Sequence, residues 1–118
     1  KIAKKYCGLE DAKAKEQNAI NKHSHTDQKM FSLHMYLAYL KYGFSRATSD
    51  TSIEIRHKRM SRKQGLKIVK KYDHIFPSKY TNDYCNYFKM SKRVFFENVD
   101  KFKNKSIFTK NYKKYFFI

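Results

Sequence analysis

The chain has 118 residues, with 27 Lys and Arg against 10 Asp and Glu, which gives a formal net charge of +17. This length suits one domain and leaves little room for a second. The charge favours polyanionic partners such as nucleic acid, an anionic membrane or phosphorylated substrates. A genome rich in A/T codons would enrich lysine as well, without a functional cause.

The longest apolar stretch without charge, 30–40, is too short to span a bilayer. No signal peptide is visible at the start of the chain. Cys7 and Cys85 are far apart and form no CxxC pair, so we expect two reduced thiols and no zinc site. These features predict a cytoplasmic protein with no membrane partner.

Residues 1–29 are polar and predict a weak helix over 9–21 or a linker. The pair His23 and His25 has no third ligand nearby, so we expect no metal site there. Residues 30–42 are apolar on nearly all sides and predict the central, most buried helix. Gly43 is well placed to end that helix.

Thr48 or Ser49 is predicted to cap a second helix that runs to about Lys58, which leaves Arg46 in the preceding loop. Ser61 and Gln64 form a capping-box pattern that predicts a third helix, ending at 73–77.

Two further helices are predicted, one over 81–90 and one capped by Ser91. Residues 106–109 and 115–118, on either side of Lys110-Asn111, can form a short hairpin. The fold class that follows is mainly α, a small helical unit of about five helices with a short C-terminal β-hairpin. We expect the many Tyr and Phe side chains to fill its core.

The chain has five arginines, and four of them fall between 46 and 62. A guanidinium grips a carboxylate or phosphate with two parallel hydrogen bonds, which lysine cannot do. Arg56 and Arg59 share a helix face, and Arg46 lies near the amides at the start of that helix, where an anion is favoured. Either these arginines bind an anion or they form structural ion pairs with Asp50, Glu54 or Asp73.

Residues 41–73 read KYGFSRATSDTSIEIRHKRMSRKQGLKIVKKYD. This stretch resembles the C-terminal signature of the N-acetyl sugar amidotransferases, in the PP-loop ATP pyrophosphatase superfamily. These proteins serve lipopolysaccharide O-antigen, pseudaminic acid and legionaminic acid pathways, and the similarity extends over about residues 30–118. Ser45 and Lys58 replace usual glycines, where a side chain would hinder a close approach of the backbone to a ligand. Lys63-Gln64 replaces a usual Glu-Glu pair.

The resemblance implies that ATP adenylates the carbonyl oxygen of an N-acetyl group on a nucleotide-activated sugar. Ammonia from a partner glutaminase then leaves an acetamidino group, in surface polysaccharide or flagellin glycan biosynthesis. ATP and Mg would bind mainly to a PP-loop domain outside this chain. Residues 30–118 would be the helical C-terminal domain, after a weakly ordered segment over 1–29. The substrate- or phosphate-binding residues carried over by the resemblance are Arg46, Thr48, Asp50, Arg56 and Arg59.

The residues themselves contain no Gly-rich phosphate loop, no GxSxG and no carboxylate pair that would serve as an acid/base dyad. We therefore do not expect this chain to be catalytic alone, and no catalytic residue is assigned. The alternative is a stand-alone basic helical module that binds nucleic acid, since the helices over 49–58 and 61–73 suggest a helix-turn-helix. Its turn lacks the usual glycine, which disfavours DNA binding. The isolated unit could also self-associate.

Overall fold

The computed structural model describes residues 5–8, 28–111 and 114–117. The elements in chain order are α3 (Lys29–Tyr42), α4 (Arg46–Arg56), α5 (Arg62–Tyr72), the 3-10 turn η1 (Ser78–Tyr80), α6 (Thr81–Tyr87), α7 (Lys92–Lys101), β1 (Phe108–Asn111) and β2 (Lys114–Phe117). The predicted mainly helical fold class is confirmed. The helix or linker predicted over 9–21 and the pair His23 and His25 lie outside the described residues.

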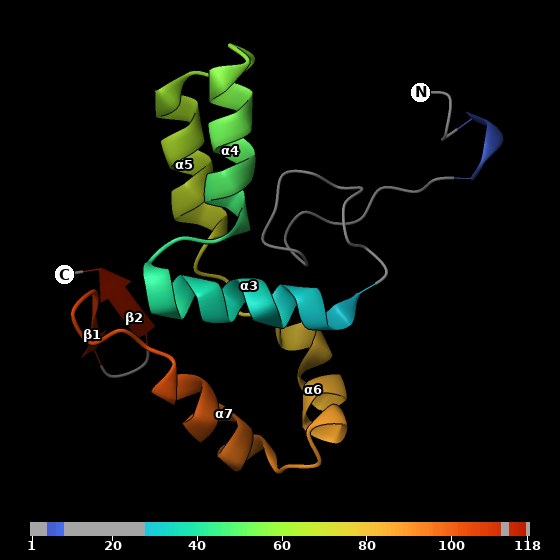
Figure 1. Ribbon diagram of the computed structural model, residues 1–118, viewed down its shortest axis with the longest axis vertical. Helices are drawn as coiled ribbons and strands as arrows, with labels where there is room; N and C mark the ends of the chain where they lie inside the picture. Colours follow the sequence, from blue (N-terminus) through green and yellow to red (C-terminus); the bar gives the residue numbers. More distant parts are fainter. Residues whose placement is uncertain (1–4, 9–27, 112–113, 118) are drawn as a thin grey trace.

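Helix α3 is the centre of the arrangement, as predicted. The α4–α5 hairpin stands on one side of α3, and α6 and α7 lie on the other (Figure 1). A helix that is apolar nearly all round can be covered on both sides in this way. Within the described ranges, no helix has both the length and the apolar character needed to cross a membrane.

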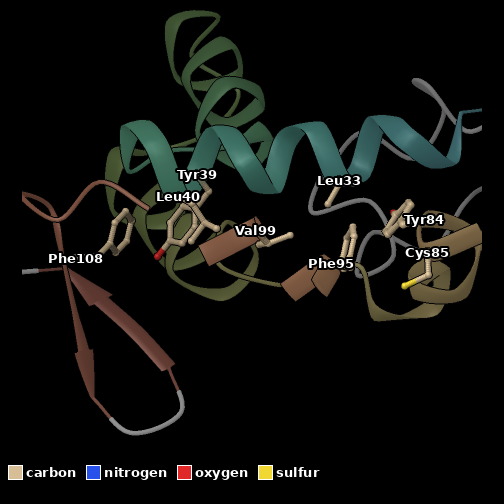
Figure 2. Close-up of a cluster of buried hydrophobic side chains, with 8 residues drawn as sticks. All are labelled: Leu33, Tyr39, Leu40, Tyr84, Cys85, Phe95, Val99 and Phe108. Carbon is tan, nitrogen blue, oxygen red and sulfur yellow. The ribbon is translucent and has the colours of Figure 1, made fainter. Parts of the chain in front are cut away.

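The hydrophobic core follows α3 on its α6–α7 side. Figure 2 shows its side chains arranged along the helix, with Tyr84 and Cys85 at one end and Phe108 at the other. Leu40 and Tyr84 are fully buried. The core residues are Leu33, Tyr39, Leu40, Tyr84, Cys85, Phe95, Val99 and Phe108. Half of them are aromatic, so the aromatic residues build the core here as expected.

Polar contacts fix the chain around this core. The Tyr84 hydroxyl donates to the Lys29 carbonyl at 3.0 Å, which joins α6 to the start of α3. After α7, the Asn104 amide N–H donates to the Leu40 carbonyl at 2.9 Å, which joins the chain to the end of α3. Tyr36, partly buried against the core, has its pKa raised to about 12, chiefly by burial of its hydroxyl.

Strands β1 and β2 pair antiparallel, from Phe108 opposite Phe117 to Asn111 opposite Lys114. A C-terminal hairpin is therefore present as predicted, but its strands are displaced along the chain. Lys110 and Asn111, which were expected to separate the strands, belong to β1. Phe108 anchors it, because its ring centroid lies 5.1 Å from that of Tyr39 in the core.

Local capping rules predicted the starts of α5 and α7. Ser61 and Gln64 form the expected capping box at α5, and the Ser91 hydroxyl accepts from the Val94 amide at the start of α7. The predicted end of α6 at Met90 is wrong, because the helix stops at Tyr87. Lys89 adopts a left-handed φ of 52°. The Met90 amide then donates to the Cys85 carbonyl, which closes the helix end.

Candidate functional site

The turn between α3 and α4 begins at Gly43. Its φ of 81° is left-handed, and its amide donates to the Tyr39 carbonyl at 2.8 Å. This confirms the predicted end of the central helix, since a residue without Cβ adopts this conformation freely. Only Phe44 and Ser45 separate Gly43 from the start of α4.

The cap at the start of α4 comes from Asp73, the residue directly after the end of α5. Its side chain is buried, with 3% of the residue exposed. Its carboxylate accepts from the backbone N–H groups of Ser45, at 3.0 Å, and Thr48, at 3.2 Å, and from the Thr48 hydroxyl. These are the two amides that a capping box satisfies, the N–H of the N-cap residue and that of the third helical residue. The negative charge also suits the positive end of the helix dipole.

The remote cap explains why the predicted start of α4 at Thr48 or Ser49 is wrong. The helix begins at Arg46, after Ser45, and ends at Arg56 rather than near Lys58. The Ser45 hydroxyl donates to the Met35 carbonyl at 3.1 Å, so it does not cap the helix itself. Arg46 therefore belongs to the first turn of α4 and not to the preceding loop.

Arg46 and Asp50 meet in a buried contact against α3. The Arg46 guanidinium carbon lies 5.1 Å from the centroid of the Phe31 ring, and its Nε lies 4.0 Å from Asp50 Oδ2. Burial lowers the pKa of Arg46, and the Asp50 carboxylate partly offsets that effect. The sequence left open whether Arg46 binds an anion or forms a structural ion pair. This geometry favours the structural ion pair with Asp50.

Arg59 is held by Glu54. Its Nε and Nη2 each donate to a Glu54 carboxylate oxygen at 2.7 Å. The hydrogen bond from Arg59 lowers the pKa of Glu54, and the same bond raises the pKa of Arg59. The planar fork of this guanidinium is thus engaged within the chain.

Arg56 differs from the other two predicted arginines. Its side chain is exposed and forms no hydrogen bond or ion pair with any residue that the structure describes. It lies at the end of a surface groove of about 380 Å³ along α4, lined by Phe44, Thr48, Ser49, Ser52, Ile53 and Arg56. The structure therefore brings Thr48 and Arg56 to one groove, although the Thr48 hydroxyl already donates to Asp73. Arg46, Asp50 and Arg59 are used in internal contacts.

Ser45 and Lys58, which replace glycines in the pattern that residues 41–73 resemble, both have structural explanations. Ser45 is 1% exposed and has an ordinary extended φ of −137°, so it lies inside the α3–α4 junction. Lys58 has a left-handed φ of 56° and follows the end of α4. The Arg59 amide donates to the Glu54 carbonyl there, the pattern of a helix end that favours glycine.

The start of α4 does not fit a bound phosphate. Two of its amides are already satisfied by Asp73, and that buried carboxylate would repel a second anion. Within residues 5–8, 28–111 and 114–117, no group of three or more His, Cys, Asp or Glu side chains could hold a metal ion.

Three residues of the region escaped the sequence-based predictions. Ser49 and Ser52 share a face of α4 with Arg56, and this helical spacing was a usable signal. Asp73 was considered only as an ion-pair partner for arginine. No local pattern indicates that it would bind amides 25 and 28 positions earlier in the chain.

The pair α4 and α5 does not favour the helix-turn-helix alternative. The two helices run alongside one another in Figure 1, whereas that motif crosses its helices at a steep angle. They approach closely at Gly65, because a Cβ at this position would lie 2.8 Å from Ile55 Cδ1.

Fold and site together define a small helical domain with a hydroxyl- and arginine-lined groove on a polar hairpin. Residues 4–117 match the family described as "LPS biosynthesis protein WbpG-like, C-terminal domain". Because the match covers nearly the whole chain, the chain belongs to this family. No curated protein matched the chain in a separate comparison.

Proposed function

We propose that this chain is the C-terminal domain of an ATP-dependent sugar amidotransferase in lipopolysaccharide or related glycan biosynthesis. The observation that carries the proposal is membership of the WbpG-like C-terminal domain family over residues 4–117. The similarity of residues 41–73 to the amidotransferase signature supports the finer reaction.

In the proposed reaction, the carbonyl oxygen of a sugar N-acetyl group attacks the α-phosphorus of ATP and pyrophosphate leaves. Ammonia, released from glutamine by a partner glutaminase, adds to the activated carbon. AMP then departs with the oxygen and a proton is lost, which leaves the acetamidino group. The enzyme would act in the cytoplasm, where ATP and nucleotide sugars are made.

We assign ATP and Mg to a domain outside this chain, because the described residues provide neither a phosphate loop nor a cluster of metal ligands. Of the residues carried over by resemblance, Arg56 and Thr48 line the exposed groove and are proposed to face the substrate. Arg46, Asp50 and Arg59 are proposed to support α4 through their internal contacts.

The test is reconstitution of the natural full-length protein with its glutaminase, ATP, an N-acetylated nucleotide sugar and glutamine labelled with heavy nitrogen in its side-chain amide. We expect mass spectrometry to find the label in the sugar product, in place of the carbonyl oxygen, and AMP and pyrophosphate in equal amounts. Formation of ADP, or a sugar product without the label, would overturn the proposed reaction.

A further inference from the structure

The groove along α4 combines three kinds of recognition chemistry in one small space. Ser49, Ser52 and Arg56 recur at helical spacing on one face, with Ile53 beside them. Phe44, from the turn before the helix, closes the groove at its other end. A cation, hydroxyl groups and an aromatic ring are therefore brought to one surface.

The polar residues of the groove can still bind a ligand. Arg56 makes no hydrogen bond or ion pair within the described part of the chain, and Glu54, the nearest acidic residue in sequence, is taken by Arg59. The Ser52 hydroxyl donates to the Thr48 carbonyl at 2.7 Å, which leaves its oxygen able to accept. A hydroxyl-rich anion would find one strong cation and two hydroxyls here.

Two apolar residues of the groove are exposed to solvent. Phe44 is 49% exposed and Ile53 is 41% exposed. Phe44 also stacks on Tyr42, with ring centroids 6.1 Å apart. An exposed aromatic face favours the weakly positive C–H face of a sugar or the plane of a base.

We propose that this groove binds a nucleoside-diphosphate sugar, with Arg56 on the diphosphate, Ser49 and Ser52 on ring hydroxyls, and Phe44 against a ring. This inference rests on the proposed function, since it names the substrate of that function as the occupant. The groove volume of about 380 Å³ is enough for part of such a ligand. The buried cap by Asp73 keeps α4, and with it the groove, in place.

The assignment distinguishes the sugar nucleotide from ATP, which also carries a diphosphate. In the full-length enzyme, Arg56→Ala and Phe44→Ala should each raise KM for the nucleotide sugar, by about tenfold or more for Arg56, because a charge-assisted bidentate contact is lost. KM for ATP should stay unchanged. The matched control is Arg62→Ala, which removes an equal charge from the same hairpin outside the groove. All three positions are exposed, so melting temperatures should be nearly equal.

A direct binding measurement separates this inference from the reaction itself. Calorimetry with UDP-N-acetylglucosamine on the full-length protein should show binding that Arg56→Ala weakens and Arg62→Ala does not. If that pattern holds but no acetamidino product forms, the reaction is wrong and the groove assignment stands. If Arg56→Ala behaves like Arg62→Ala, if KM for ATP changes instead, or if the wild-type protein does not bind the probe, the assignment is overturned.

Discussion

The two sides of α3 are held by different forces. On the α6–α7 side, a continuous row of apolar and aromatic side chains is buried, with Leu40 and Tyr84 fully excluded from solvent (Figure 2). On the other side, the buried residues of α4 and α5 are Arg46, Ala47, Thr51 and Gly65. The hairpin therefore has no large apolar residue that is fully buried among those the structure describes.

Because of this difference, we expect the two sides of α3 to contribute differently to the free energy of unfolding and to the position of the groove. Apolar burial is strong but has little directional preference. Hydrogen bonds to a buried carboxylate, and a close approach at a glycine, fix position and orientation instead. The α6–α7 side should therefore set the free energy of unfolding, and the α4–α5 side should set where the groove lies.

The largest effect is expected from Leu40→Ala, which removes a fully buried side chain from the core. The free energy of unfolding should fall by about 2–5 kcal/mol, because the loss of apolar burial adds to the cost of a cavity. Urea unfolding followed by circular dichroism measures this. Leu66→Ala, at a position 49% exposed on α5, is the control and should change little. Equal losses in the two variants would contradict the proposed contrast between the two sides of α3.

Asp73→Ala should have the next largest effect, about 2–3 kcal/mol, because it leaves the buried amide of Ser45 and the partly buried amide of Thr48 without an acceptor. Amide hydrogen exchange should become faster at Ser45 and Thr48 first, while the core amides of α3 respond less. Asp83→Ala removes an exposed pair with Lys29 and one exposed charge from the first turn of α6, so it should cost less, about 1 kcal/mol or below. Unchanged exchange at Ser45 and Thr48 in Asp73→Ala would show that the cap does not hold α4.

The helix ends show which parts of the molecule can be predicted from neighbouring residues in the sequence. The central helix, its end at Gly43 and the caps at Ser61 and Ser91 depend on residues within four positions of each other, and all were predicted. The start of α4 depends on Asp73, which is brought near only when α5 packs beside α4. The roles of the arginines were left open for the same reason, since only the folded chain decides which carboxylate lies beside which guanidinium.

Gly65→Val tests the close approach of α4 and α5. We expect a loss of about 1–3 kcal/mol, because the larger side chain meets Ile55 across the interface. Gly65→Ala should be nearly neutral, since the displaced atom is the end of a flexible side chain and alanine gains up to about 1 kcal/mol in helix propensity. Adding Ile55→Val should recover part of the loss in Gly65→Val. No recovery in that double variant would rule out steric contact as the cause.

Lys58→Gly should stabilise the chain by up to about 1 kcal/mol, because Lys58 has a left-handed φ of 56° that costs nothing for glycine. Lys58→Ala keeps the Cβ and should bring no such gain. Lys89→Gly, at the matched position after α6 with φ of 52°, should act in the same direction. Thermal unfolding measures all three, and a destabilised Lys58→Gly would contradict this account of the helix end.

The smallest effect is expected from Glu54→Gln, at the exposed pair with Arg59. Hydrogen bonding to Arg59 lowers the pKa of Glu54 below its ordinary value of 4.5, so the carboxylate stabilises the folded chain above that pH. As the pH falls through the lowered pKa, this stabilisation is lost. Glu54→Gln should therefore lower the melting temperature slightly at neutral pH and match the wild type in strong acid, where both side chains are uncharged. Arg59→Gln should give the same profile, because either substitution breaks the same pair. A difference from wild type that persists in acid would show that Glu54 acts through packing of α4 and not through its charge.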